Sequence, residues 1–556
     1  MGQLPVRLDG QAGEQAIRAV RLGSEVRPTL PPGASSIVYP LADAPNAPTL
    51  WVGLGLEPKG DAARWRAEVR IERDGVPPAT FLSESIATSG AWRDLRLPLE
   101  PTISQDARLV LYATLEEASG DSPRRLLWGD PVLLPEQPLA RPSVILVSLD
   151  TLRADHVGSR LKGRSRTPRL DAFAAEAVRY THAYSPSHWT LPSHVSLLWG
   201  RHPGVLDRVK AADGLAPPDV LGPVASLAER FADEGYLTGA MTGGGWMSNT
   251  LGLGPWHPFS RGFDVFKSFE VPHQKAGECD PRRFDGDTVF GWAEEWVRTQ
   301  AEHPYFLFVH TYEAHDRCPF FPPGDDAGLV WRYDAERQPK LLAYYDELVE
   351  RTDALFGRLL DAVAASGQAD RTIIAVTSDH GEAFFEHGAG GHGCGIRGYD
   401  ELTRVPLIVR PAKDTAAPAI VAAPVSVVQM APTLTALAGI ADGPPFDEPP
   451  LPGLDIRGGR APDAVVVQCE DQLAVRSGSY KLLSDRRRRR PDQLYDLAAD
   501  PGETVDIATR PGTVHPTLAA VAEAYWATLD GAAGIVRPSD VDAETRKQLH
   551  ALGYVE

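Results

Sequence analysis

Three runs of consecutive apolar residues constrain the fold of this chain more than any other feature. They lie at 144–147, 306–309 and 373–376, and stretches with helical periodicity separate them, the clearest at 341–359. A strand that is apolar at every position is buried on both faces, as are parallel strands between two layers of helices. We therefore predict an α/β fold with a doubly wound sheet, the catalytic domain, over residues 141–458.

The regions on either side of this domain have different patterns. Over residues 1–140, apolar and polar residues alternate in short runs broken by Gly and Pro, which predicts an accessory β-sandwich of jelly-roll type. We expect this sandwich to be independent and to supply no catalytic residue, so that removing 1–138 leaves turnover within about tenfold. Short strands and a final helix predict a small α+β subdomain with a tail over residues 459–556.

The acidic balance of the chain limits its partners. Its 556 residues include 56 Lys and Arg against 74 Asp and Glu, a formal net charge of −18. Nucleic acids and anionic membranes bind proteins with surplus positive charge, so we expect neither as a partner. The one basic run, 486–490, precedes Pro491 between strand-like segments, and we interpret it as a solvated hairpin tip.

No segment of the sequence indicates a membrane span or an export signal. No stretch approaches the roughly 20 apolar residues needed to cross a bilayer, and the first residues lack an apolar signal core. The sequence as given predicts a soluble, cytoplasmic protein, with an exported form as the alternative. Four cysteines without a CxxC pair exclude a disulfide framework but neither compartment. The sequence carries no signal for the oligomeric state.

Carboxylate and imidazole residues follow each of the three apolar runs. They are Asp150 after the first run, His310, Glu313, His315 and Asp316 after the second, and Asp379, His380, His387 and His392 after the third. Ligands of open α/β sheets bind beyond the carboxyl ends of the strands, so we expect these side chains to meet at one edge. Carboxylates combined with imidazoles are typical of a metal site.

A candidate nucleophile stands where a helical pattern begins. The spacing of Leu191, Val195 and Leu198 predicts a helix with Thr190 at its N-cap and Pro192 in its first turn. The positive end of the helix dipole favours an alkoxide and a bound tetrahedral anion at this place. A threonine that only caps the helix is the alternative, because threonine is a common cap residue.

Several motifs, in their order along the chain, resemble those of the sulfatase family of the alkaline phosphatase superfamily. They are SLDTLRADH, TLPSHVSLLWG, TGGGWMS with RGFD following, FLFVHTYEAH, SDHGEAFFEHG, YDELTRVPLIVRP, and YKLL with QLYDLAADPGE. The resemblance covers roughly residues 141–556, down to the ending LHALGYVE. It implies an alkaline-phosphatase-like sheet flanked by helices, a small C-terminal sheet subdomain, and hydrolysis of an ester of a tetrahedral oxyanion at a divalent metal.

The nucleophile motif departs from that of the sulfatases. Sulfatases carry C-x-P-S-R or S-x-P-S-R, in which the Cys or Ser is oxidised to formylglycine, whereas this chain has TLPSH from Thr190. The Cβ of threonine carries a methyl group, so oxidation cannot give an aldehyde and Thr190 must act as a plain hydroxyl. The motif is similar to T-F-P-N-H of the nucleotide pyrophosphatase/phosphodiesterase branch. His194, in place of the motif arginine, is a further candidate catalytic residue.

The ligands that the resemblance implies also differ from the family pattern. Sulfatases bind calcium through Asp-Asp and Asp-Asn pairs, which are Asp150-Thr151 and Asp379-His380 here. The resemblance therefore implies a first site of Asp150, Asp379, His380 and the Thr190 hydroxyl. Imidazole favours zinc or manganese, and calcium is the third candidate.

The cations that hold sulfate in the family are replaced as well. His392 stands where sulfatases have lysine after the EHG motif, and no lysine lies around 242–246. We therefore expect a second divalent ion, held by His315, His392 and a carboxylate such as Glu313. Either histidine is also a candidate for the acid that protonates the leaving group.

These motifs predict a metal-dependent hydrolase of phosphate mono- or diesters in which Thr190 forms a covalent phosphothreonine. A sulfatase that works without formylglycine is one alternative. A catalytically degenerate glycan-binding protein, with the sandwich as its binding surface, is another. Trp51, Trp65, Trp92 and Trp128 could stack on sugars there, but we expect them to be core residues, because tryptophan is highly buried on average. A transferase is a third, because an alcohol can replace water. The substrate is an ester, with a carbohydrate as one candidate for its alcohol part, and we expect specificity on the loops at 243–285 and 319–337.

Overall fold

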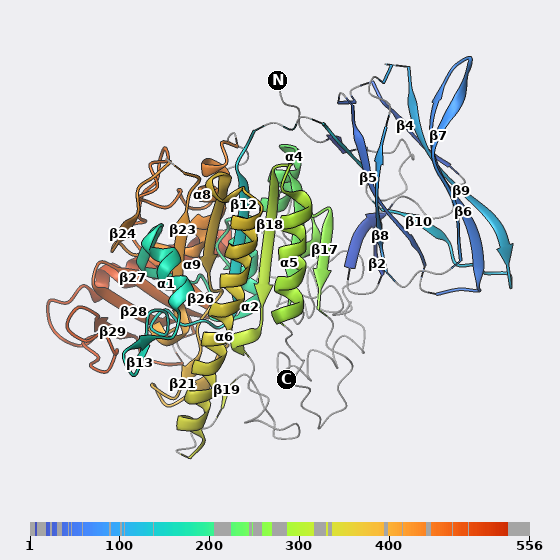
Figure 1. The fold of residues 1–556 in the computed structure, drawn as a ribbon. Coiled ribbons are helices and arrows are strands. Elements are labelled where there is room, and N and C mark those ends of the chain that lie inside the picture. The colour runs from blue at the N-terminus through green and yellow to red at the C-terminus, as the bar shows by residue number, and fades with distance from the viewer. Residues whose placement is uncertain are drawn as a thin grey trace.

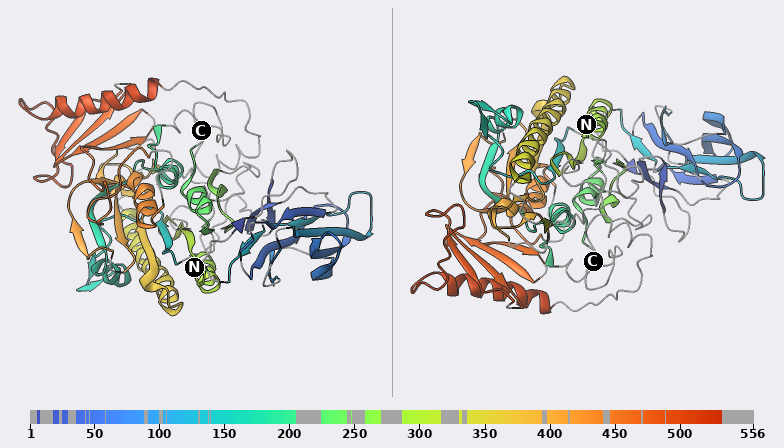
Figure 2. Two further views of the ribbon diagram at one scale, coloured as in Figure 1. Left: turned by 90° about the horizontal axis from the view of Figure 1, so that it is seen from above. Right: turned by 90° about the horizontal axis from the view of Figure 1, so that it is seen from below.

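A computed structural model shows a central sheet between helices, with a β-sandwich at one end and a small antiparallel sheet at the other (Figures 1 and 2). The described residues are 6–7 and 18–531, with gaps at 23–24, 30–35, 43, 46, 58, 88–90, 100–102, 105, 130, 137, 139, 205–223, 244–246, 248–257, 270–285, 316–329, 332–335, 394–397, 414, 441–445, 470 and 488. The ending LHALGYVE and most of the two expected specificity loops therefore lie outside the described residues.

The central sheet is mixed, with parallel strands at its middle. Its order is β2 (Arg18–Leu22), β3 (Glu25–Thr29), β17 (Val265–Ser268), β16 (Leu237–Thr242), β18 (Tyr305–Thr311), β12 (Ser143–Leu149), β20 (Thr372–Thr377), β23 (Arg404–Arg410), β15 (Val178–Tyr184) and β24 (Ala419–Val421), with β25 (Val425–Ser426) also pairing with β15. The strands from β17 to β20 are parallel, and β23 is antiparallel to both of its neighbours. The predicted α/β fold is confirmed.

The three apolar runs of the sequence are β12, β18 and β20, side by side at the centre of the sheet. Every residue of these strands is buried. Ile145 and Val147 of β12 belong to the apolar core on one face, while Val144 and Leu146 belong to the core on the other. A strand with apolar side chains on both faces can be stable only under two layers of cover, which is why these runs have no polar alternation.

Helices supply both layers. On one face lie α1 (Pro168–Ala175), α5 (Gly286–Gln300) and α6 (Arg337–Ala365), and on the other lie α2 (Thr190–Trp199), α4 (Leu227–Asp233) and α8 (Met430–Leu437). The hairpin of β21 (Ala383–Phe384) and β22 (Gly390–Gly391) follows β20, pairs with β19 (Val330–Trp331), and precedes the short helix α7 (Asp400–Thr403). This hairpin carries one candidate histidine toward the carboxyl end of the sheet.

The C-terminal part is an antiparallel sheet covered by one helix, as expected. It consists of β26 (Val465–Cys469), β27 (Gln472–Ser477), β28 (Tyr480–Asp485), β29 (Gln493–Asp496) and α9 (His515–Gly531). The basic run lies in the β28–β29 hairpin, where Arg487 and Arg489 pair with Asp471 at 2.6 and 3.0 Å. Both arginine side chains are more than half exposed, which confirms a solvated hairpin tip.

The N-terminal part contains the expected sandwich of two antiparallel sheets. One sheet has β1 (Val6–Arg7), β11 (Val132–Leu134), β5 (Thr49–Leu56), β10 (Leu126–Trp128) and β8 (Arg93–Pro98), and the other has β4 (Ser36–Pro40), β9 (Arg108–Ala118), β6 (Ala63–Arg73) and β7 (Val76–Ile86). Alternate residues of both sheets form a shared apolar core, which includes Leu50, Val69 and Leu111.

The sandwich is not independent of the catalytic sheet, which differs from the expectation for residues 1–140. Strands β2 and β3 lie within residues 1–140 but belong to the central sheet. Val26 of β3 pairs with Phe266 of β17. Trp51 belongs to the same apolar core as Ile145, and its ring lies edge-on to that of Trp296, 6.1 Å between centroids. Alternation along a strand shows which side chains are buried but not which sheet the strand joins, so the sequence did not reveal this connection.

The shared core predicts that Trp51→Ala destabilises the catalytic sheet as well as the sandwich. Removing a buried tryptophan should lower the free energy of unfolding by about 3–5 kcal/mol, and amide hydrogen exchange in β12 should become faster. Ile71→Ala, which truncates a side chain of the sandwich core only, is the control and should leave exchange in β12 unchanged. Unchanged β12 exchange in Trp51→Ala would instead restore the picture of an independent sandwich.

Candidate active site

Three side chains from the ends of two neighbouring strands converge at the carboxyl edge of the sheet. Asp150 follows β12, and Asp379 and His380 follow β20. One ligand atom of each lies within 4.8 Å of those of the other two, and all three residues are buried. The parallel register of β12 and β20 aligns the two strand ends. The convergence expected at this edge is therefore present, and the group has the spacing that a single metal ion requires.

The turn after β12 is held in a strained conformation that joins these strand ends. Thr151 has φ of 57°, an uncommon value for a β-branched residue. Its N–H donates to Asp379 Oδ1 at 3.3 Å, and its carbonyl accepts from the Tyr345 hydroxyl at 2.8 Å. Such strain costs about 1–3 kcal/mol and is typical of functional sites. Here it fixes the position of Asp150 relative to Asp379.

The tautomer of His380 suits a metal ligand. Its Nδ1 lies 2.8 Å from the carbonyl oxygen of Gly381, which can only accept, so Nδ1 carries the proton. The lone pair is then on Nε2, which lies 3.3 Å from Asp379 Oδ2 and 3.3 Å from Thr190 Oγ1. A second partner that fixes the ring in this way is usual for ligating histidines.

Asp379 supplies a further test of whether a cation fits this group. Its Oδ1 accepts hydrogen bonds from the N–H groups of Thr151 and His380, while Oδ2 accepts none from the described residues. Burial raises the pKa of the Asp379 carboxyl, whereas His380 and His194 lower it when they are protonated, and the net shift is below its usual range. A buried, ionised carboxylate with an oxygen lacking a hydrogen-bond donor suits a divalent cation.

Thr190 is the first residue of α2 and not its N-cap, which corrects the expected position by one residue. The N-cap is Trp189, with extended backbone at φ −161° and ψ 162°, while Pro192 does lie in the first turn. Thr190 Oγ1 donates to Asp150 Oδ2 at 3.3 Å and lies equally far from His380 Nε2. Because its hydroxyl has these partners across the sheet, it is directed into the ligand group, a relation that helix periodicity cannot reveal.

His194 lies behind Thr190, and both of its ring nitrogens have protein partners. Nδ1 donates to the Thr190 carbonyl at 2.9 Å, and Nε2 accepts from the Ser148 hydroxyl at 2.9 Å. Burial lowers the pKa of the His194 imidazole, which favours the neutral form. These hydrogen bonds place His194 beneath the first turn of α2, where it connects the backbone of Thr190 to Ser148 of β12.

His310 belongs to the polar cluster expected after the second apolar run, but the sequence assigned it no catalytic or metal-binding role. It lies at the end of β18 opposite Ser148 of β12, and its Nε2 is 3.4 Å from Asp150 Oδ2. Burial, with His194 close by, lowers the pKa of the His310 imidazole well below its usual value. The register of the two apolar runs, which aligns their ends, is the signal that could have identified this residue.

Of the residues expected to hold a second metal ion, Glu313 does not lie with His315 and His392. Glu313 faces elsewhere, with Oε1 2.7 Å from Arg351 Nε and Oε2 accepting from the Gly286 N–H at 3.1 Å. Glu313 and His315 both lie in the 3-10 helix η5 (Glu313–His315), in which residues two apart point in different directions. The carboxylate that contacts His392 is Glu382, a residue that the sequence analysis gave no role.

His315 and His392 nevertheless adjoin the ligand group. Their ring centroids are 5.1 Å apart, and the His392 ring is 4.4 Å from that of His380. Arg153, in the motif after Asp150, is buried and engaged by Asp155 at 2.7 Å and by Glu386. Imidazoles therefore adjoin the ligand group on this side, whereas the Arg153 guanidinium is committed to carboxylates.

The tryptophans of the sandwich are core residues, as the sequence favoured, and not an exposed glycan-binding surface. Trp51, Trp92 and Trp128 are buried, and Trp65 is half-buried with its Nε1–H donated to the Arg124 carbonyl at 2.6 Å. Buried indoles cannot stack on a sugar in solution. Trp128 packs in the sandwich core, Trp51 in the core shared with β12, and Trp92 in a small cluster with Leu22 and Leu127.

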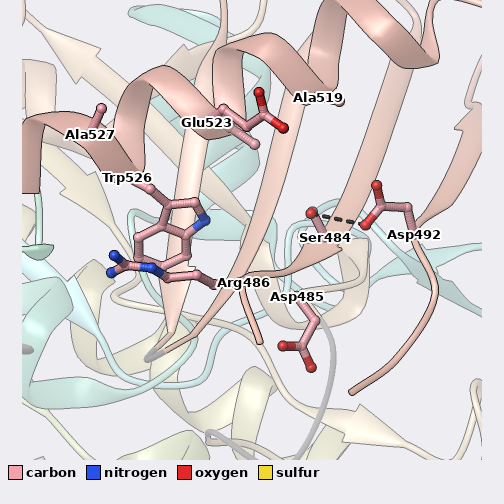
Figure 3. Close-up of a pocket in the computed structure, with 9 residues that line it drawn as sticks. Ser484, Asp485, Arg486, Asp492, Ala519, Glu523, Trp526 and Ala527 are labelled. Carbon is pink, nitrogen blue, oxygen red and sulfur yellow. Dashed lines mark hydrogen bonds between the residues drawn. The ribbon is translucent and has the colours of Figure 1, made fainter. Parts of the chain in front are cut away.

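A cavity of about 240 Å³ lies away from the ligand group, between α9 and the β28–β29 hairpin (Figure 3). Arg486 lies over the Trp526 ring there, 5.0 Å from its centroid, and the Ser484 hydroxyl donates to Asp492 at 2.9 Å. No residue of the ligand group lines this cavity.

Within the described part of the chain, no helix has both the length and the apolar character needed to cross a membrane.

The fold and the strand-end group together define an ester hydrolase of the alkaline phosphatase superfamily. The family model described as Sulfatase matches residues 142–440, more than half of the chain. The chain therefore belongs to the sulfatase family, as its motifs indicate.

Named relatives and solved structures agree with this assignment. Arylsulfatase A of Bos taurus is 27% identical over 67% of this chain and 85% of its own length. N-acetylgalactosamine-6-O-sulfatase of Bacteroides thetaiotaomicron is 23% identical over 68% of this chain and 91% of its own. In structure, a 2-O GAG sulfatase matches with a TM-score of 0.56 and 19% identity, over 73% and 96% of the two chains. Phosphonate monoester hydrolase of Agrobacterium radiobacter gives a TM-score of 0.52 at 19% identity, over 70% and 96%, which shows a shared fold.

Metal binding should stabilise the protein only when the ligand group is intact. In chelator-treated protein, zinc or manganese at 100 times its Kd should add about 2.7 kcal/mol to the free energy of unfolding, because only the folded chain presents the site. Asp379→Asn should lose the corresponding rise in Tm. The exposed Asp361 gives the matched control, and Asp361→Asn should keep the rise. An equal rise in wild type and Asp379→Asn would contradict the metal assignment.

Proposed function

We propose that this chain hydrolyses phosphate mono- or diesters, with Thr190 as the nucleophile and a divalent cation at Asp150, Asp379 and His380. The observation that carries the proposal is the place of the Thr190 hydroxyl, 3.3 Å from both Asp150 Oδ2 and His380 Nε2. It stands where the sulfatase motif has the residue that becomes formylglycine, and threonine cannot undergo that oxidation. An unmodified hydroxyl suits direct attack on phosphorus.

The surrounding residues favour this role. A bound divalent cation would lower the pKa of the Thr190 hydroxyl and offset negative charge on the ester. Asp150 can accept the hydroxyl proton, and the N-terminal end of α2 favours the alkoxide. His194 holds the carbonyl of Thr190 from behind, which keeps the hydroxyl directed at the ligand group. Thr190 then attacks phosphorus in line, and water hydrolyses the resulting phosphothreonine.

Two further points support zinc or manganese and a phosphate ester. The ligand His380 is an imidazole, which these ions accept more readily than calcium does. The family's arginine and lysine are histidines here, His194 and His392, so a cation must supply more of the positive charge. A phosphate monoester, as a dianion, gains more from that charge than a sulfate monoester, which like a phosphate diester carries a single charge.

Sulfate ester hydrolysis without formylglycine is the second candidate, and the names of the relatives favour it. Several relatives are named for sulfated carbohydrates, so we propose a carbohydrate as the alcohol part of the ester for either candidate. The glycan-binding alternative is less favoured, because the first ligand group is complete and the sandwich tryptophans are buried or half-buried. Transfer of the phosphoryl group to an added alcohol would distinguish a transferase.

Replacing Thr190 tests whether its hydroxyl is the nucleophile, as both candidate functions require. Thr190→Ala should lower kcat/KM by at least about 10⁴-fold, or 5.5 kcal/mol in barrier, and should keep the metal-induced rise in Tm. Thr190→Ser retains a hydroxyl and is the matched control, so it should keep most of the activity. The assay measures turnover of 4-nitrophenyl phosphate, bis(4-nitrophenyl) phosphate and 4-nitrophenyl sulfate with zinc or manganese. It reports the loss of activity in each variant and the preference for phosphate over sulfate.

Two results would contradict the proposal. One is a Thr190→Ala variant with the rate of wild type, which would remove the nucleophile assignment. The other is faster turnover of the sulfate than of both phosphate esters, which would favour the second candidate.

A further inference from the structure

A buried carboxylate–imidazole pair lies at the base of the β21–β22 hairpin. Nδ1 of His392 is 3.1 and 3.3 Å from the two carboxylate oxygens of Glu382, and both residues are buried. A carboxylate accepts, so Nδ1 is the donor, and Nε2 is the nitrogen left to face other groups. The pair therefore fixes both the tautomer and the ring orientation of His392.

The hairpin explains why these two residues face each other. Ala383 pairs with Gly391 and Phe384 with Gly390, so Glu382 and His392 are the next residues on the two strands. Arg153 donates to the Glu382 carbonyl at 3.1 Å, which anchors the first of these strands from the turn after β12. The pair is thus set by backbone pairing and not by a mobile loop.

His392 is also close to the nucleophile. The N–H of Gly393 donates to the His188 carbonyl at 3.1 Å, two residues before Thr190. The His392 ring is 4.4 Å from the ring of His380, whose Nε2 is 3.3 Å from Thr190 Oγ1. The imidazole of His380 therefore lies between His392 and the attacking hydroxyl. At this separation, His392 can contact an ester oxygen other than the one that faces the ligand group.

We propose that His392 donates a proton to the leaving-group oxygen and that Glu382 is the positioning residue that aims it. The inference rests on the ester hydrolysis proposed above and assigns one of its steps. In its imidazolium form, whose charge the Glu382 carboxylate stabilises, His392 carries a proton on both ring nitrogens. As the phosphorus–oxygen bond to the leaving group breaks, the Nε2 proton passes to that oxygen, the alcohol departs, and the ring is left neutral with its proton on Nδ1. The water that hydrolyses phosphothreonine then forms its bond to phosphorus and returns a proton to Nε2, while the Thr190 oxygen leaves.

A second pair of the same chemistry provides the control. Nδ1 of His387 is 2.6 Å from Glu401 Oε1, and the His387 ring stacks on Tyr399 with 3.6 Å between centroids. This pair lies in the same loop region, but the His387 ring contacts Glu401, the Glu503 carbonyl and Tyr399, none of which belongs to the ligand group. Loss of its carboxylate should affect folding or loop packing without affecting one ester more than another.

The test compares esters that need a proton on the leaving group with esters that do not. Nitrophenolate leaves readily without a proton, whereas an alkoxide does not. Glu382→Leu should lower kcat/KM for benzyl phosphate by at least about 100-fold and that for 4-nitrophenyl phosphate by less than about 5-fold. His392→Gln should show the same selectivity, and Glu382→Gln, which keeps an acceptor for Nδ1, should restore most of the benzyl ester activity. Glu401→Leu should change both substrates by one common factor.

The outcomes separate this inference from the proposed function. Equal losses for the two esters in Glu382→Leu would overturn it, and if that variant does not fold, equal losses in His392→Gln decide the matter in the same way. Wild-type protein inactive on phosphate and sulfate esters alike would overturn both this inference and the proposed function. The same selectivity seen only with the corresponding sulfate esters would support the role of His392 and overturn the preference for phosphate.

Discussion

The parallel pairing of β12 with β18 on one side and β20 on the other determines where the candidate ligands lie. Backbone hydrogen bonds place Ser148 opposite both His310 and Thr377, so the residues that follow these strands leave the sheet at one edge. Asp150 and Asp379 are thereby buried together, an arrangement that is costly without positive charge nearby. The histidines around them and the fit for a divalent cation both follow from this constraint.

Much of this arrangement could be predicted, because its cause is visible in the sequence. The three apolar runs identify the buried strands, and the polar residues after them mark the edge where Asp150, Asp379 and His380 meet. Other features depend on pairing that periodicity does not encode. The register of β21 and β22 selects Glu382 as the partner of His392, whereas Glu313 lies in a 3-10 turn and faces Arg351. Likewise, alternation in β3 did not show that it joins β17.

Under the proposed function, two substitutions relative to the sulfatase pattern account for a different chemistry at the site. Threonine in place of the oxidisable residue leaves an unmodified hydroxyl, which Asp150 and His380 contact. Histidine in place of the lysine brings an imidazole that Glu382 orients, where a fixed cation would otherwise stand. The first change alters how the ester is attacked, and the second alters how the alcohol can leave. Together they favour phosphorus chemistry on a fold shared with sulfatases and phosphonate monoester hydrolase.

The identity of the nucleophile is the central claim, and covalent trapping tests it most directly. Metal-loaded protein is mixed with 4-nitrophenyl phosphate, quenched with acid before the steady state, and digested for mass spectrometry of the peptide containing Thr190. We predict a phosphoryl group on Thr190, in an amount matching the initial burst of nitrophenol. A burst with Thr190 unmodified, or with the phosphoryl group on another residue, would contradict the account.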